Sequence, residues 1–271
     1  MITLNSDAAS TSLSKTTKAI LNEYGIKLNK NLGQNYLIDR NKRDQIIQFG
    51  NLTKDDVVLE IGPGIGTLTI ELAKRVKKVI AIEQDSNICQ ILENRLKKEN
   101  IDNVELINDD ALNVEFPKFD KIISNLPYQI SSPITFKFLN YDFQLAILMY
   151  QKEFASRMNG KVGSKDYSRL SAMLYFKCDV DLLTGVSAES FIPKPKVDST
   201  VVRLTPKLPE LNGQLKHLNI NEINEKDFKT YSKFVKALFQ HRNKKVKNAL
   251  IDSRHIITDL DKKEMKAKLN S

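Results

Sequence analysis

The chain has 271 residues, of which 41% are hydrophobic and 28% are charged, so it can bury a full core and remain soluble. Its 42 Lys and Arg residues outnumber the 33 Asp and Glu residues, which gives a net charge of +9. Such a charge can serve solubility alone, but it favours an anionic partner such as nucleic acid. The longest apolar runs are far too short to cross a membrane, which argues against an integral membrane protein.

The N-terminal segment divides into a polar tail and a predicted helix. Residues 1–14 are rich in Ser and Thr and lack the apolar core of a signal peptide, so we expect a disordered tail. An organelle transit peptide is disfavoured because this tail contains no Arg and includes Asp7. Residues 16–24 follow a helical pattern. Basic residues cluster around this helix, at Lys15, Lys18, Lys27 and Lys30.

A strand, a glycine-rich loop and a helical pattern follow one another between residues 57 and 76. The run 57–61 predicts a buried strand, and the glycine loop 62–66 comes directly after it. Glycines let a ligand approach the backbone closely, and the N-terminus of the next helix offers free N–H groups. The spacing G-x-G-x-G differs from the G-x-G-x-x-G pattern of dinucleotide-binding proteins. The loop therefore indicates either a nucleotide-type site or a simple tight turn.

The next two predicted strands are each followed by a carboxylate. The strand 78–82 ends at Glu83, about 20 positions after the glycines, where an acidic side chain can bind ribose hydroxyls. The strand 104–107 is followed by Asp109 and Asp110, and a carboxylate there can accept a hydrogen bond from the amine of adenine. Each of these carboxylates alone is equally compatible with a solvated strand end.

The fourth predicted strand, 121–124, runs directly into Asn125-Leu126-Pro127-Tyr128. The Asn125 side-chain oxygen and the Leu126 carbonyl can both accept hydrogen bonds from one planar amine, such as the exocyclic amine of adenine. Pro127 stiffens the turn because its φ is fixed, and Tyr128 offers an aromatic face for stacking. Alone, this stretch is also compatible with an ordinary Pro-containing turn. The carboxyl ends of parallel strands meet at one edge of a sheet, however, so the four strand-end signals should converge on one crevice. NAD-dependent enzymes share the glycine loop and the acidic residue after the second strand, but their chemistry does not require the Asn-Leu-Pro-Tyr turn.

The second half of the chain contains a basic loop between predicted strands. Three further strands are predicted, at 145–150, around 180–182 and at 200–204. The glycine-containing segment 160–170 is either a surface loop or an RNA contact in which Arg157 and Arg169 bind phosphates.

The C-terminal residues 207–271 are polar and helical in pattern, and Pro206 and Pro209 mark the linker that precedes them. The basic stretch 240–247 follows an apolar helical run, so we expect it to extend a packed helix with a cationic end. Phosphate contacts of this kind give affinity and salt dependence, and they do not select a base sequence.

Cysteine and histidine usage gives no sign of a metal site. Cys89 and Cys178 are far apart, and they indicate reduced core thiols in a cytosolic protein. The three histidines form no ligand cluster in the sequence, so we expect no metal.

Three stretches make the chain resemble the S-adenosylmethionine-dependent rRNA adenine dimethyltransferases. The similarity extends from about residue 15 to about residue 250. Residues 32–39 resemble the first motif of this family, with Tyr36 where Phe is usual. Residues 125–133 match the small-subunit branch, the KsgA/Dim group, and residues 191–199 match a late loop on the target side. The basic stretch 240–247 resembles archaeal and eukaryotic members.

The resemblance implies an α/β fold of the Rossmann-like class I methyltransferase type. Its sheet would be mostly parallel and seven-stranded, with an antiparallel final strand. This domain would span residues 15–206, and residues 207–271 would form a small helical RNA-binding domain.

The resemblance also implies roles for the matched residues. Asn35 and Leu37 would border the methionine end of S-adenosylmethionine, Glu83 would bind the ribose and Asp110 the adenine amine. The full cofactor-binding set would be Gln34, Asn35, Leu37, Gly62, Gly64, Glu83, Asp110 and Asn125. The catalytic set would be Asn125, Leu126, Pro127, Tyr128 and Phe191, with Tyr128 and Phe191 on the two faces of the target base. RNA phosphates would be bound by Arg157, Arg169, Lys194, Lys196, Arg242, Lys244 and Lys245.

The expected function is dimethylation of two adjacent adenosines near the 3′ end of small-subunit rRNA, by a cytoplasmic monomer that acts on this RNA or on the pre-small ribosomal subunit. An Erm-like enzyme for large-subunit rRNA is disfavoured by Leu126, by residues 131–133 and by the basic stretch 240–247. A DNA adenine methyltransferase would favour Asp in place of Asn125 and usually has a separate base-reading domain. A non-catalytic assembly factor is disfavoured because none of the motifs is eroded.

Overall fold

The computed structural model describes residues 12–26, 34–207 and 225–270. The predicted tail lies largely outside the described residues, as do Lys27, Lys30 and Pro209. The described residues form two compact units. The first contains the residues up to Ala155 together with Asp181–Thr205, and the second contains Ser156–Val180 and the residues from Pro206 onward. Residues 156–180, which the sequence analysis assigned to the methyltransferase domain, thus group with the C-terminal helices.

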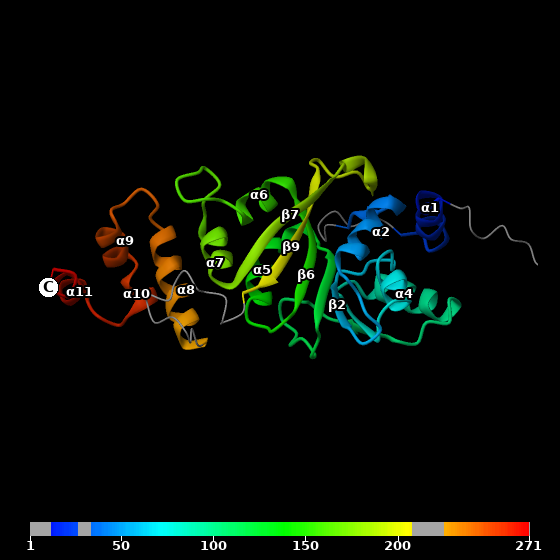
Figure 1. Ribbon diagram of the computed structural model, residues 1–271, viewed down its shortest axis with the longest axis horizontal. Coiled ribbons are helices and arrows are strands. Elements are labelled where there is room, and N and C mark those ends of the chain that lie inside the picture. Colours follow the sequence, from blue (N-terminus) through cyan, green and yellow to red (C-terminus); the bar gives the residue numbers. More distant parts are fainter. Residues whose placement is uncertain (1–11, 27–33, 208–224, 271) are drawn as a thin grey trace, which may run out of the picture. The chain divides into compact units, whose positions relative to one another are not determined.

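A seven-stranded sheet with the strand order β4-β3-β2-β5-β6-β9-β7 is the centre of the fold (Figure 1). The pairs β2/β3, β3/β4, β2/β5 and β5/β6 are parallel, and β9 is antiparallel to β6. This confirms the predicted fold class. The strands are β2 (Val57–Ile61), β3 (Lys78–Glu83), β4 (Val104–Asn108), β5 (Lys121–Asn125), β6 (Leu145–Gln151), β7 (Cys178–Val186) and β9 (Ser199–Pro206).

The central strands are buried along nearly their whole length, which explains why they are nearly continuous apolar runs in the sequence. Four of the five residues of β2 and five of the seven residues of β6 are buried. Parallel strands covered on both faces need apolar side chains at successive positions and not at alternate ones. The edge strand β7 has only its first and last residues buried, so its sequence gives a weaker strand signal.

Three helices of the first unit begin at side chains that cap them. Ser12, Asp39 and Asp85 each accept a hydrogen bond from a backbone N–H in the first turn of α1, α2 and α4 respectively. The helices are α1 (Leu13–Glu23), α2 (Arg40–Phe49), α3 (Thr69–Ala73), α4 (Ser86–Lys98) and α5 (Ser131–Phe138), and the 3-10 turns are η3 (Tyr128–Ile130) and η4 (Ala188–Ser190). The helix α6 (Lys152–Met158) begins in the first unit and ends in the second.

A separate two-stranded sheet joins two motifs that lie more than 150 residues apart in the sequence. The strand β1 (Tyr36–Leu37) pairs antiparallel with β8 (Phe191–Ile192), so that Tyr36 is opposite Ile192 and Leu37 is opposite Phe191. This pairing was not predicted from the sequence. It brings the first family motif against the late target-side loop.

The second unit consists of helices. They are α7 (Arg169–Lys177), α8 (Glu225–Phe239), α9 (Val246–Asp252), α10 (Arg254–Ile257) and α11 (Lys262–Lys268). The Tyr231 hydroxyl on α8 donates to the Ala172 carbonyl on α7 at 2.9 Å, and the Tyr231 ring stacks on Phe176 with centroids 4.5 Å apart. These contacts join α7 to α8 within this unit.

The prediction that the basic stretch extends a packed helix is wrong. The helix α8 ends at Phe239, and residues 240–245 form a turn before α9. A continued helix would place Arg242 and Lys245 one turn apart, and like charges at that spacing are destabilising. In the turn, the Arg242 guanidinium donates to the Tyr167 carbonyl at 2.7 Å.

None of the described helices combines the length and apolar character that crossing a bilayer requires. Within the described part of the chain, no group of three or more His, Cys, Asp or Glu residues is arranged to hold a metal ion. Cys89 and Cys178 are both buried and free.

Candidate active site

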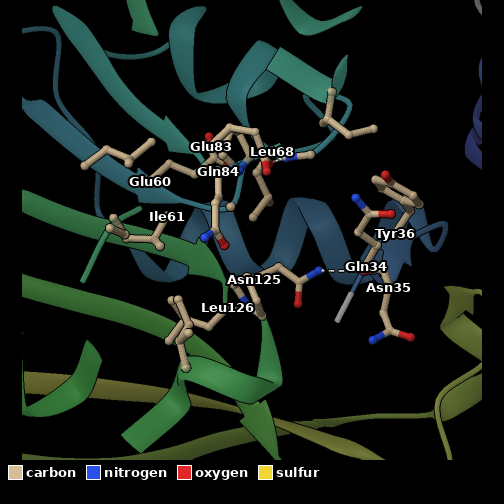
Figure 2. Close-up of a pocket in the computed structure, with 18 of the residues that line it drawn as sticks. Gln34, Asn35, Tyr36, Glu60, Ile61, Leu68, Glu83, Gln84, Asn125 and Leu126 are labelled. Atoms are coloured by element: carbon tan, nitrogen blue, oxygen red, sulfur yellow. Dashed lines mark hydrogen bonds between the residues drawn. The ribbon is translucent and has the colours of Figure 1, made fainter. Parts of the chain in front are cut away.

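A pocket opens where the carboxyl ends of β2, β3, β4 and β5 meet (Figure 2). Figure 2 shows side chains from several of these strand ends, among them Glu83 and Asn125, drawn around one cavity together with Gln34 and Asn35. The residues proposed from the sequence that line this pocket are Gln34, Asn35, Leu37, Gly62, Gly64, Glu83, Asp110, Asn125, Leu126, Pro127 and Tyr128.

The glycine loop has a conformation that side chains would not tolerate. Gly62 and Gly64 have φ angles of 67° and 56°, in the left-handed region that favours glycine. A Cβ atom on Gly62 would lie 2.9 Å from Pro127, and one on Gly64 would lie 2.9 Å from the Tyr36 ring. The loop can therefore pass close to both the turn at residues 125–128 and β1 only because these positions are glycine.

The carboxylate of Glu83, which lines the pocket, is held by backbone N–H groups. It accepts from Gly64 N at 3.2 Å and from Asp85 N at 3.0 Å. Burial raises the pKa of Glu83, the nearby Asp85 charge adds to that effect, and the backbone hydrogen bonds oppose it. Gln34 Nε2 donates to Asp85 Oδ2 at 3.1 Å, so this hydrogen bond also holds the segment before β1 next to Asp85.

The loop after β4 presents Asp110 at the pocket. Asp110 Oδ1 accepts from Leu112 N at 2.9 Å, and Oδ2 accepts from the Asn113 side-chain amide at 3.1 Å. Backbone bonds from Asn113 N and Val114 N to the Asp110 carbonyl continue the same tight turn. The orientation of this carboxylate thus depends on the shape of the loop that carries it.

Asn125 is oriented by a backbone carbonyl across the pocket. Its Nδ2 donates to the Asn35 carbonyl at 3.1 Å, and Figure 2 shows the side chain directed toward the 34–36 segment. With the amide nitrogen used in this way, Asn125 Oδ1 remains as an acceptor. The Tyr128 hydroxyl lies 2.6 Å from Ser199 Oγ, and burial raises the Tyr128 pKa against the effect of that hydrogen bond.

Phe191 occupies a different position from the other predicted catalytic residues. It is 2% exposed and packs in the hydrophobic core with Leu37, its partner in the β1–β8 pairing. It is not among the described residues that line the pocket. Contact between Phe191 and a target base therefore stays a prediction. Such a contact requires the Phe191 ring to become exposed.

Glu60 is a pocket residue that the sequence analysis missed. It is the fourth of the five residues of the strand β2, is 2% exposed and lines the pocket. Its Oε2 atom has no hydrogen-bond partner among the residues that the structure describes. Burial raises the pKa of Glu60 to about 8, and the charge of Glu83 acts in the same direction. The one signal in the sequence was an acidic residue inside an otherwise apolar strand.

The predicted RNA-binding side chains are all at least partly exposed, and two of them pair with acidic side chains. Lys194 pairs with Glu189, and Lys244 pairs with Asp252 at 2.6 Å. Arg242 is held by the Tyr167 carbonyl. The remaining members are the exposed Arg157, Lys196 and Lys245 and the half-exposed Arg169. Surface ion pairs of this kind are weak and do not prevent a phosphate from competing.

Comparisons with known proteins show which family the chain resembles over most of its length. The family model for ribosomal RNA adenine dimethylase matches residues 25–268. A protein of Methanosphaera stadtmanae named probable ribosomal RNA small subunit methyltransferase A is 50% identical over 94% of this chain and 88% of its own length. The protein of the same name from Methanothermobacter thermautotrophicus is 47% identical over 92% of this chain and 85% of its own.

Two solved structures have the same fold over most of the chain. A dimethyladenosine transferase from Plasmodium falciparum has a TM-score of 0.68 and 36% identity, over 79% of this chain and 74% of that one. The 23S rRNA methyltransferase ErmE has a TM-score of 0.64 and 28% identity, over 87% of this chain and 89% of that one. The chain therefore belongs to the ribosomal RNA adenine dimethylase family, whose cofactor is S-adenosylmethionine.

Proposed function

We propose that this protein transfers methyl groups from S-adenosylmethionine to the exocyclic amines of two adjacent adenosines near the 3′ end of small-subunit rRNA. The observation that carries this proposal is the hydrogen bond from Asn125 Nδ2 to the Asn35 carbonyl, because it leaves Asn125 Oδ1 free to accept from an amine. The Leu126 carbonyl, the next acceptor along the same turn, is the partner for the second N–H of that amine.

The pocket fits the cofactor by the chemistry of its lining. Glu83 supplies a carboxylate at the strand end where ribose hydroxyls are bound in open α/β sheets. Asp110 supplies an acceptor for the adenine amine, and the glycine loop leaves room that a Cβ atom on Gly62 or Gly64 would fill. When bound, S-adenosylmethionine supplies an electrophilic methyl group and a positive charge.

The protein promotes methyl transfer mainly by positioning the reacting groups, and less by acid–base chemistry. The lone pair of an exocyclic amine is delocalised into the adenine ring, so this nitrogen is a poor nucleophile. Acceptance by Asn125 Oδ1 and the Leu126 carbonyl favours a pyramidal nitrogen whose lone pair points at the methyl donor. Tyr128 supplies an aromatic face for the base, which has to leave its stack to enter the pocket. Fixed orientation of this kind accounts for a large part of the rate enhancement in such reactions.

We further propose that the substrate is the pre-small ribosomal subunit and that the protein acts on it as a monomer in the cytoplasm. The archaeal relatives named for the small subunit are more similar in sequence than the large-subunit enzyme. A target base that is buried in the mature subunit would also favour an assembly intermediate. Lys196, Lys245 and the other exposed basic residues supply non-specific affinity for the RNA backbone.

The test is methyl transfer from labelled S-adenosylmethionine to undermethylated small and large ribosomal subunits, followed by nucleoside analysis. Dimethyladenosine in the small subunit alone is the expected result. Label only in the large subunit would instead indicate an Erm-like enzyme. Cofactor binding without label in either subunit would indicate a binding protein.

Asn125→Ala should lower methyl transfer by at least about a hundredfold, because an acceptor that orients the reacting group is lost. Asn140→Ala, which removes an exposed amide just after α5, is the matched control and should retain full activity.

A further inference from the structure

Lys137 lies in the last turn of α5 and reaches the loop that carries Asp110. Its Nζ donates to the Ala111 carbonyl at 2.8 Å and also to the Val114 carbonyl. The ammonium group lies 4.2 Å from the centroid of the Phe116 ring. One side chain thus contacts the beginning, the middle and the end of the 111–116 segment.

These contacts fix the part of the loop that touches the pocket. Ala111 directly follows Asp110, is 5% exposed and lines the pocket itself. Its carbonyl is a buried acceptor, and a buried acceptor that loses its donor costs free energy unless the backbone moves. The Ala111 carbonyl belongs to the peptide bond with Leu112, and the N–H of that same peptide donates to Asp110 Oδ1 at 2.9 Å. A movement of this peptide would therefore also displace the donor that orients the Asp110 carboxylate.

Lys137 also belongs to the helix that follows the proposed base-binding turn, residues 125–128. The 3-10 turn η3 contains Tyr128 and leads without a break into α5, which starts at Ser131. Tyr128, Gln129 and Ile130 all line the pocket. Lys137 therefore attaches the helix behind the base-binding turn to the loop on the cofactor side.

We infer that Lys137 is a positioning residue, which holds the Asp110 loop in the shape that binds the adenine of the cofactor and fixes that loop relative to the base-binding turn. The inference rests on the role proposed above for Asp110. Partial burial lowers the pKa of Lys137, while the carboxylates of Glu115, Asp110 and Asp109 act in the opposite direction and favour the charged lysine.

The test is direct binding of S-adenosylmethionine and of S-adenosylhomocysteine to the whole protein, measured by calorimetry without RNA. Lys137→Met keeps the length of the apolar stem and removes the donors. It should raise the Kd of both ligands by about tenfold, because the adenine is common to both and a charged hydrogen-bond donor is lost. Lys137→Arg keeps donors at this position and should stay within about threefold of the wild type.

Lys118→Met is the matched control, since Lys118 is an exposed lysine in the segment that leads to β5. It should bind both ligands as the wild type does. If Lys137→Met is not folded, Lys137→Gln serves in its place, because the amide is uncharged yet polar.

A double-mutant cycle separates positioning of Asp110 from a general loss of structure. In an Asp110→Ala background, Lys137→Met should change the Kd by less than about twofold, because the acceptor that it positions is already absent. A tenfold effect that recurs in that background would overturn the inference, as would wild-type affinity of Lys137→Met itself. Since no RNA is used, failure of this inference is distinct from a failure of the methyl-transfer assay.

Discussion

Glu60 should make the stability of this protein fall as the pH rises above the acidic range. The residue is 2% exposed, and burial raises the pKa of its carboxyl group from 4.5 to about 8. Below pH 4.5 the group is protonated in both the folded and the unfolded chain, so it has no effect on the pH dependence. Between pH 4.5 and about 8 the unfolded chain releases the proton while the folded chain keeps it, which favours unfolding.

The size of this effect follows from the difference between the two pKa values. Each unit corresponds to about 1.4 kcal/mol, so the native state is penalised by roughly 3 kcal/mol at pH 7 and by roughly 5 kcal/mol well above pH 8, where the penalty no longer grows. Glu60→Gln removes the titration and keeps the shape of the side chain. Its free energy of unfolding, relative to the wild type, should therefore increase by roughly 3–4 kcal/mol between pH 5 and pH 8.

The measurement is urea unfolding of the wild type and of Glu60→Gln at several pH values from 4.5 to 8.5. Comparing the two proteins at each pH cancels the titration of every other group. Glu93→Gln, which removes an exposed carboxylate from α4, is the control and should change stability by less than about 0.5 kcal/mol. Parallel curves for the wild type and Glu60→Gln would refute the reasoning, since they would mean that Glu60 titrates alike in the folded and unfolded chains.

Four further substitutions at three positions test other parts of the site and the core. Gly62→Ala should destabilise the protein by about 1–3 kcal/mol in urea unfolding and weaken cofactor binding, because its Cβ would lie 2.9 Å from Pro127 at a φ of 67°. Lys121→Met should cost roughly 3–5 kcal/mol by the same assay, because it leaves the Asp56 carboxylate, 2.9 Å from Lys121 Nζ, buried without its cation. Tyr128→Phe should slow methyl transfer by less than about tenfold, since it loses one hydroxyl contact but keeps the stacking face; Tyr128→Ala should slow it further, by the loss of about 1–3 kcal/mol of stacking.

Much of the fold could be predicted because its central strands have strong local signals. The predicted runs 57–61 and 145–150 correspond to β2 (Val57–Ile61) and β6 (Leu145–Gln151). Parallel strands buried on both faces have to be apolar at successive positions, so their sequence alone marks them. The edge strand β7 extends from Cys178 to Val186, well beyond the predicted 180–182, because an exposed edge does not need a continuous apolar run.

The features that could not be predicted depend on contacts between distant segments. The pairing of β1 with β8 involves only two residues from each strand, too few for a periodic pattern. This pairing buries Phe191 in the core, whereas the motif alone suggested a ring beside the target base. The basic turn after Phe239 was missed for a related reason, because its shape depends on a bond from Arg242 to the Tyr167 carbonyl.

The candidate site divides in the same way between local signals and distant contacts. Residue types such as Glu83 and Asn125 could be assigned from their places at strand ends, because an open sheet gathers those ends at one crevice. What orients them is largely backbone, namely the Gly64 and Asp85 N–H groups for Glu83 and the Asn35 carbonyl for Asn125. Backbone groups have the same chemistry at nearly every residue. The sequence therefore does not indicate which backbone group will hydrogen-bond to a given side chain. Substitutions that move these backbone segments without touching a ligand should therefore reduce function as strongly as substitutions of the side chains that bind it.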